Sequence, residues 1–97
     1  MERFALVVTL KIKHGSADAF IPLITENRRL SLANEEGCRN FVVMKDLEEA
    51  DTFHFYEEYD NLGAFKKHQD SEHFKRYYDA AKDLMVERIW HRCSVIE

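Results

Sequence analysis

The stretch FHFYEEYDNLGAFKKHQDSEHFKRY, residues 53–77, decides the fold, because an alternating run passes there directly into two short helical patterns. Phe53, Phe55, Glu57 and Tyr59 recur with a period of two and share one face of a predicted strand. We expect this largely aromatic face to be buried, and a buried carboxylate needs a partner or a shifted pKa. On residue type alone, Glu57 is explained by a bond to a neighbouring backbone or basic group.

Two helices are predicted downstream of that strand. Asp60 and Asn61 offer an N-cap for a short helix that carries Leu62, Phe65 and His68. A second cap at residues 70–71 precedes a longer helix whose buried stripe would be Phe74, Tyr77, Tyr78, Ala81, Leu84 and Met85. The last two aromatic residues of that helix, Tyr77 and Tyr78, are expected to be core residues.

Upstream, residues 3–13 alternate with apolar side chains on both faces, which predicts a strand that is covered on both sides. Ser16 is then a candidate N-cap for a first helix, and Gly37 is a candidate left-handed stop at its end. Pro22 lies inside this helical pattern and has no backbone donor, so we expect a bend in the first turns or a later start. No function is assigned to Pro22.

The inward stripe of this first helix begins apolar and then becomes polar. Phe20 and Ile24 are followed on the same face by Asn27 and Ser31, at steps of three and four residues. Polar groups on such a stripe usually satisfy nearby backbone groups. The alternative is that they open onto a polar cavity, where a few fixed donors and acceptors orient a ligand.

The remaining elements complete an α+β pattern. Residues 38–45 and 53–59 predict two strands of a hairpin, and residues 88–96 predict the last strand. The order strand, helix, strand, strand, helix, strand is that of the ferredoxin-like split βαββαβ fold, with a four-stranded antiparallel sheet and both helices on one face. Because the other face also carries apolar residues, we expect a homodimer joined through the sheets.

Composition narrows the classes of function. Ninety-seven residues with 45% hydrophobic content and no repeat or linker predict a single domain over residues 1–97. Interspersed charges with a net charge of −4 argue against nucleic acid. No apolar run approaches the roughly 18 residues of a membrane span, and no signal peptide is recognised, so we expect a cytoplasmic protein with no membrane partner. Cys38 and Cys93 are expected to be reduced core residues.

Several motifs in this order carry a family resemblance. They are Asn27 and Ser31 with the run 35–38, then Phe41, the strand end 56–59, and the helical segments 64–68 and 71–74. The chain resembles the antibiotic biosynthesis monooxygenase family of small dimeric α+β-barrel proteins over nearly its whole length. Within the family it looks closest to the branch that holds the phosphorylated autoinducer-2 isomerase.

The resemblance implies a dimeric α/β barrel with a pocket between the sheet and the helices of each subunit, acting without metal, flavin or haem. The family includes monooxygenases of quinol-like substrates, the isomerase, haem-degrading relatives and members without known activity. A cofactor-free monooxygenase needs a substrate that can become a carbanion and pass an electron to dioxygen, so the protein supplies a base and oxyanion donors. The isomerase of a phosphorylated hydroxy-ketone needs nearly the same parts.

The resemblance and the predicted positions together suggest the site residues. His68 is the candidate base or donor, Asn27 the amide that orients the substrate oxygen, and Glu57 the carboxylate that fixes a histidine tautomer or titrates itself. The candidate substrate-binding residues are Ser31, Tyr56, His73 and Phe41.

Plainer explanations exist for the same residues. His68 could cap a short helix, and His73 could be exposed to solvent. His68 and His73 are five residues apart across a predicted helix break and have no third ligand in sequence, so we expect no zinc site and no cofactor. Two classes of function remain, a cofactor-free enzyme on a small oxygenated metabolite and a non-catalytic module that binds such a molecule.

Overall fold

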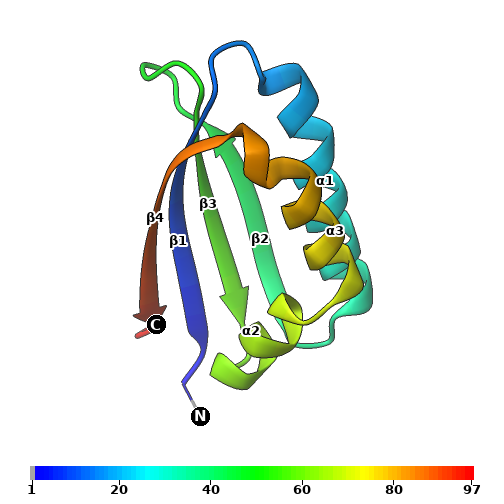
Figure 1. Cartoon of the computed structure of the whole chain (residues 1–97). Coiled ribbons are helices and arrows are strands. Elements are labelled where there is room, and N and C mark those ends of the chain that lie inside the picture. Colours follow the sequence, from blue (N-terminus) through cyan, green and yellow to red (C-terminus); the bar gives the residue numbers. More distant parts are fainter. Residues whose placement is uncertain (1) are drawn as a thin grey trace.

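The computed structural model describes residues 2–97 and confirms the predicted α+β, ferredoxin-like architecture (Figure 1). The chain runs through β1 (Phe4–Ile12), α1 (Ala17–Asn34), β2 (Cys38–Lys45), β3 (Thr52–Tyr59), α2 (Leu62–Gln69), α3 (Glu72–Ala81), the short 3₁₀ turn η1 (Lys82–Leu84) and β4 (Met85–Ser94). No described helix has the length and apolar character needed to cross a membrane.

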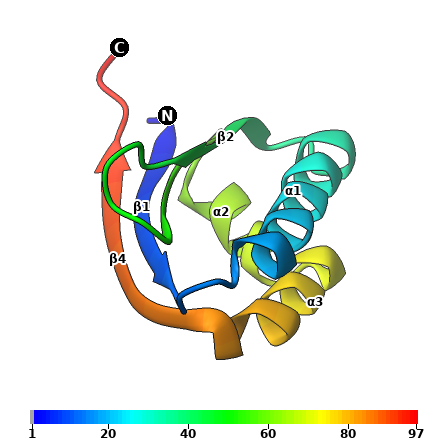
Figure 2. The same ribbon diagram turned by 90° about the horizontal axis from the view of Figure 1, so that it is seen from above.

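The four strands form one antiparallel sheet in the order β2-β3-β1-β4. β2 and β3 make the predicted hairpin, and β1 lies in the interior of the sheet between β3 and β4. Figure 2 shows the sheet curving around the helices, with α1 and α3 side by side facing it, and Figure 1 shows α2 near the lower end of the sheet. β2 and β4 are therefore the two edges of the sheet.

The core lies between the sheet and the helices. Cys38 belongs to it, but Cys93 is exposed on the edge strand β4, so the prediction of a core position is wrong for Cys93. The inward residues Leu6, Val8 and Leu10 of β1 are each at most 3% exposed, and they meet Phe20 and Ile24 of α1. On β3, the predicted inward set is confirmed, since Phe53, Phe55, Glu57 and Tyr59 are all buried. The period-two pattern therefore placed one carboxylate inside an aromatic core.

The start of the last strand differs from the prediction. Helix α3 ends at Ala81, and the turn η1 carries the chain back to the sheet, so β4 begins at Met85 rather than at residue 88. Met85 pairs with Ile12 across a shift in register. Leu84 and Met85 consequently do not extend the helical stripe of α3.

The ends of α1 also differ from the prediction. The helix begins at Ala17 with Ser16 in the predicted N-cap position, but the Ser16 side chain makes no capping bond, and the helix starts upstream of Pro22 rather than later. Gly37 is not in the left-handed region, which holds only Gly15 and Asp51 among the described residues. Instead, Gly37 allows close approach, because a Cβ atom there would lie 2.5 Å from the Cβ of Ala64 on α2. The glycine thus packs the end of α1 against α2.

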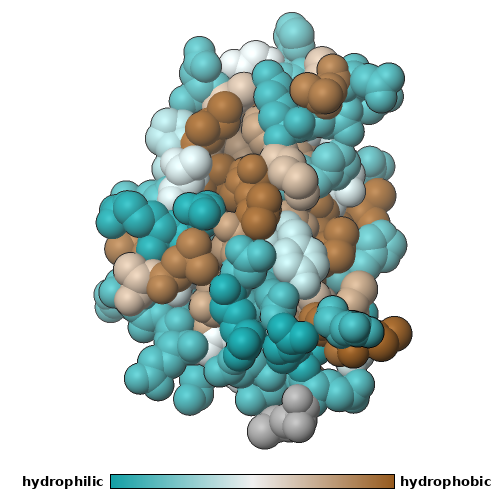
Figure 3. Space-filling view, turned by 180° about the vertical axis from the view of Figure 1, so that it is seen from behind, coloured by the Kyte–Doolittle hydropathy of each residue, from teal (hydrophilic) through white to brown (hydrophobic). Residues whose placement is uncertain are grey.

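The face of the sheet that turns away from the helices is open. Its side chains include Val7, Val42, Met44 and Ile89, each between 36% and 45% exposed. Figure 3, the view from the side away from α3, shows hydrophobic side chains gathered across the middle of the molecule with hydrophilic ones around them. We call the sheet face that carries Val7, Val42, Met44 and Ile89 the open face.

Candidate functional site

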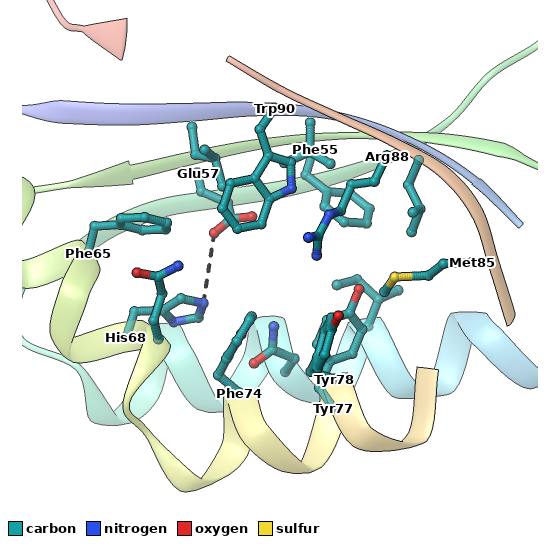
Figure 4. A pocket seen from close by; sticks show the side chains of 16 residues that line it. Phe55, Glu57, Phe65, His68, Phe74, Tyr77, Tyr78, Met85, Arg88 and Trp90 are labelled. Atoms are coloured by element: carbon teal, nitrogen blue, oxygen red, sulfur yellow. Dashed lines mark ion pairs between the residues drawn. The ribbon is translucent and has the colours of Figure 1, made fainter. Parts of the chain in front are cut away.

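A pocket lies between the helix-covered face of the sheet and the three α-helices (Figure 4). It encloses only about 30 Å³, which is room for about two water molecules. Its lining is mostly apolar and aromatic, with a few polar side chains, which is the usual make-up of a small-molecule site. The polar and titratable lining residues are Asn27, Glu57, His68, Gln69, Tyr77, Tyr78 and Arg88.

Asn27 reaches the pocket from the middle of α1. The helical period places it on the same stripe as Phe20 and Ile24, and its side chain is only 2% exposed. Its Oδ1 atom has no hydrogen-bond partner among residues 2–97. Since buried polar atoms are nearly always paired, this oxygen is available to accept a hydrogen bond from a bound molecule.

Glu57 enters the same pocket from β3. Its Oε1 atom accepts a hydrogen bond of 2.7 Å from the Tyr59 hydroxyl. Burial raises the pKa of Glu57 above the ordinary carboxyl value, against the opposing charge of His68 and the Tyr59 bond. The Nε2 atom of His68 lies 3.9 Å from Glu57 Oε1, an ion-pair distance that is too long for a hydrogen bond (Figure 4).

His68 lies in the last turn of α2 and is 1% exposed. Its ring packs between those of Tyr59 and Phe74, with centroid separations of 5.3 and 5.1 Å. Its Nδ1 atom lies 2.9 Å from a carboxylate oxygen of Glu35, so a neutral ring donates from Nδ1 and keeps the lone pair on Nε2. The acceptor nitrogen therefore faces Glu57 and the pocket.

Glu35 is a partner of His68 that the sequence analysis missed. It is the C-cap of α1, and its Oε2 atom contacts both His68 Nδ1 and His73 Nε2. Burial by itself raises the pKa of Glu35, but the hydrogen bonds and charges of the two histidines outweigh it and hold that pKa below the usual range. The other oxygen, Oε1, is buried without a partner among the described residues.

The donor atoms of Glu35, His68 and His73 all lie within 4.8 Å of one another. The exclusion of zinc assumed that the two histidines lack a third ligand, and the fold brings one from a distant part of the sequence. In the sequence, the run Glu35-Glu36-Gly37-Cys38 is notable only as part of the family resemblance. Its distance from the histidines along the chain does not indicate a shared site.

The roof of the pocket comes from β4 and α3. The Arg88 guanidinium lies over the Trp90 ring, 4.5 Å from its centroid, and 5.7 Å from that of Tyr78 (Figure 4). Trp90 pairs with Val8, which places it on the helix side of the sheet. Alternation along the last strand contained this signal, but the pairing of β4 with β1 was needed to connect it with the pocket.

None of the four predicted substrate-binding residues lines the pocket; three lie close to it and Tyr56 lies on the opposite face of the sheet. Ser31 is buried behind it, donates to the Asn27 backbone carbonyl at 2.7 Å, and lies 3.4 Å from His68 Nδ1. Phe41 packs against the His68 ring, and His73 meets Glu35. Tyr56 lies on the open face, where its hydroxyl donates to Glu58.

Comparisons with known proteins agree with this architecture. The family model described as antibiotic biosynthesis monooxygenase matches residues 3–80. A Caulobacter crescentus protein whose name places it in this family has a TM-score of 0.95 at 23% identity, over 99% of this chain and 92% of its own. A Nitrosomonas europaea protein named for the same family gives 0.92 at 21%, over 97% and 90%. A conserved Methanosarcina mazei protein gives 0.87 at 23%, over 96% and 92%.

At these identities the likeness to solved structures extends to the fold alone. No curated protein matches the chain. The family model, however, spans most of the sequence, including the α1 stripe, the Glu57 strand and both short helices. The chain therefore belongs to the antibiotic biosynthesis monooxygenase family.

Proposed function

We propose that the protein is a cofactor-free monooxygenase of a small oxygenated metabolite, a quinol or an enolisable carbonyl compound. The observation that carries the proposal is the convergence of three polar groups in one buried pocket. They are the Asn27 amide, whose Oδ1 atom has no partner among residues 2–97, the Glu57 carboxylate and the acceptor nitrogen of His68. Membership of the monooxygenase family supports the reaction class.

In the proposed reaction, Nε2 of His68 removes a proton from the substrate, and the carboxylates of Glu57 and Glu35 stabilise the imidazolium that forms. The Nδ2–H group of Asn27 donates a hydrogen bond to the substrate oxygen as it becomes negative, while its Oδ1 can accept one from a substrate hydroxyl. The resulting anion passes an electron to dioxygen, and recombination forms a carbon–oxygen bond. When a CH₂ group becomes C=O in this way, the second oxygen atom leaves as water with both hydrogens, and no other reductant is consumed.

The second candidate is isomerisation of a phosphorylated hydroxy-ketone, which Arg88 specifically favours. Its guanidinium lines the pocket beside Trp90 and Tyr78, and a guanidinium is well suited to bind a phosphate group. The same base and amide would then move a proton between neighbouring carbons without dioxygen. The sequence resemblance to the autoinducer-2 isomerase branch supports this alternative.

The two reactions are distinguished by a substrate screen with and without dioxygen. Tag-free protein, to which no metal or flavin is added, is mixed with a panel of quinols and hydroxy-ketones, free and phosphorylated. A monooxygenase consumes one dioxygen per product and stops under nitrogen. Turnover that continues unchanged without dioxygen replaces the monooxygenase with the isomerase. If compounds bind but none is converted with or without dioxygen, the protein is a binding module and not an enzyme for this panel.

We also propose that the working unit is a homodimer joined through the open face. Apolar side chains from β1, β2 and β4 lie there half-exposed in a single chain, namely Val7, Val42, Met44 and Ile89. An apolar patch of this kind is best covered by the same patch on a second copy related by a two-fold axis. The pocket lies on the other side of the sheet, so each subunit would keep its own site.

A further inference from the structure

We infer that Glu35, His68 and His73 form a binding site for one zinc ion, and that zinc bound there prevents His68 from acting as the base. The first part rests on the geometry of the three side chains. The second part rests on the proposed function, because it concerns the nitrogen of His68 that faces the pocket.

The donor set and its spacing fit zinc. Two imidazoles and one carboxylate are a common set of three protein ligands, with bonds of about 2.0–2.2 Å and a fourth position left for water. Ligand atoms around a tetrahedral ion with such bonds lie about 3.3 Å apart. Here His68 Nδ1 lies 2.9 Å from Glu35 Oε2, and all three donor atoms lie within 4.8 Å. Small rotations of the side chains are enough to close around an ion.

The three ligands come from three different helices. Glu35 caps α1, His68 lies in the last turn of α2, and His73 lies in the first turn of α3. The Glu35 and His73 side chains are 13% and 11% exposed, so an ion can reach them from solvent, whereas His68 is buried. The unpartnered Oε1 of Glu35 gives the carboxylate a second oxygen that can turn toward the ion.

The surroundings of His68 supply the second layer that metal-bound histidines usually have. A histidine that binds a metal through one nitrogen commonly donates its other N–H to a carboxylate, which fixes the ring. Nε2 of His68 faces Glu57, and Glu57 is itself held by the Tyr59 hydroxyl. A carboxylate–histidine–metal arrangement would form if Nε2 and Glu57 Oε1, now 3.9 Å apart, moved to hydrogen-bond distance.

Zinc binding would reverse the roles of the two nitrogens of His68. Without the ion, Nδ1 donates to Glu35 and Nε2 keeps the lone pair that accepts a substrate proton. With zinc on Nδ1, the ring proton must lie on Nε2, where it points at Glu57. The pocket then contains a donor where the reaction needs an acceptor, so turnover stops while the ion is bound.

Metal titration tests the site without any substrate. Tag-free, chelator-treated protein is titrated with Zn²⁺ by calorimetry and with Co²⁺ by visible absorption. We expect one ion per chain, loss of binding in Glu35→Gln and His73→Gln, and affinity about 10–100-fold weaker in Glu57→Gln. Glu36→Gln, which changes the neighbouring exposed carboxylate, should bind like the wild type. Circular dichroism checks that each variant is folded.

If the wild type binds neither ion, or if Glu35→Gln binds as well as the wild type, the site does not exist and the cluster is held by hydrogen bonds alone. Nitrogen-15 spectra of the imidazole rings test the second part. Zinc should move the His68 proton from Nδ1 to Nε2. If the proton stays on Nδ1, zinc does not prevent His68 from acting as the base, and the second part of the inference is wrong. Both readouts decide the inference even if the substrate screen finds no turnover.

Discussion

The two faces of the sheet differ in how completely their polar groups are hydrogen-bonded, although β1 and β3 contribute side chains to both faces. On the helix-covered face, burial raises the pKa of Glu57, and the Asn27 amide oxygen has no partner within residues 2–97. On the open face, His54 bonds Thr9 at 3.0 Å and Asp46 at 2.7 Å. The backbone N–H of Glu49, the His54 ring and the backbone N–H of Glu48 lower the pKa of Asp46 to about 2.

This contrast shows where chemistry is to be expected. A polar group whose bonds are complete contributes to the fold, and it has little left to offer a ligand. A buried group with an incomplete set of bonds is a cost to the fold that a ligand can remove. The covered face is therefore the candidate for catalysis, and the open face is the candidate for association.

Replacing His68, in the pocket on the covered face, should give the largest loss of turnover. His68→Ala is expected to lower turnover about 10²–10⁴-fold, because a positioned acid–base group contributes that much. Turnover and thermal midpoint are compared with those of Lys67→Ala, an exposed neighbour on the same helix, and of His68→Gln, which keeps most of the side-chain volume. Near-normal turnover in His68→Ala would transfer the role of base to Glu57 or His73.

Asn27→Ala should lower turnover about 10²–10³-fold, the usual effect of losing one oxyanion donor. Its effect on stability should be small by comparison, because the Oδ1 atom that is removed has no hydrogen-bond partner in the described chain. Asn34→Ala is the matched control, because Asn34 lies about two turns further along α1 and is exposed. If both variants turn over normally, the amide does not act on the substrate.

Val42→Lys should break the association of the open faces without harming the pocket. The side chain is 37% exposed in one chain, and a charge placed between two apolar sheets would lose its hydration on assembly. Light scattering at micromolar concentration should show a dimer for the wild type and a monomer for the variant. Leu47→Lys, at a fully exposed position in the β2–β3 turn, should remain dimeric. A monomeric wild type would contradict the proposed dimer itself.

Gly37→Ala should disturb the covered side through packing alone. The added Cβ would lie 2.5 Å from that of Ala64, and overpacking of this kind typically lowers the free energy of unfolding by about 1–3 kcal/mol. For a domain of this size, the thermal midpoint falls by about 4–8 °C per kcal/mol. Ala64→Gly in the same chain should recover much of the loss. Full stability of Gly37→Ala would show that α2 can move away.

The smallest expected effect belongs to Asp46 on the open face. Because its folded pKa of about 2 lies below the ordinary value of 3.8, its contribution to stability is present above that value and is lost as the pH falls through about 2. Asp46→Asn should therefore lower the thermal midpoint modestly at pH 7, and the difference should vanish at the acid end. Asp79→Asn, at a position 75% exposed, should show no such trend.

Local periodicity predicted the parts of the site that lie within single elements. The period of two along β3 placed Glu57 inward, and the helical stripe placed Asn27 beside Phe20 and Ile24, as the structure confirms. The same period puts Tyr56 on the opposite face from Glu57. The family resemblance suggests Tyr56 as a site residue, but the period of two, which the structure follows, turns it away from the pocket.

Sequence reasoning missed the contacts made between elements. Glu35 and His68 are 33 residues apart, and they meet only because Gly37 lets the end of α1 approach α2. Arg88 and Trp90 join the pocket through the pairing of β4 with β1, which no local pattern specifies. The early start of β4 was missed because the 3₁₀ turn after α3 continues the helical spacing for one more turn.

The small volume of the pocket beneath Arg88 and Trp90, about 30 Å³, has a consequence for ligand affinity. A quinol is larger than that space, so binding of the proposed substrate would require a conformation in which the roof has moved aside. The apparent dissociation constant then equals the intrinsic one divided by the fraction of molecules that are open. Residues that hold the roof closed can therefore alter affinity for every ligand alike without touching any of them.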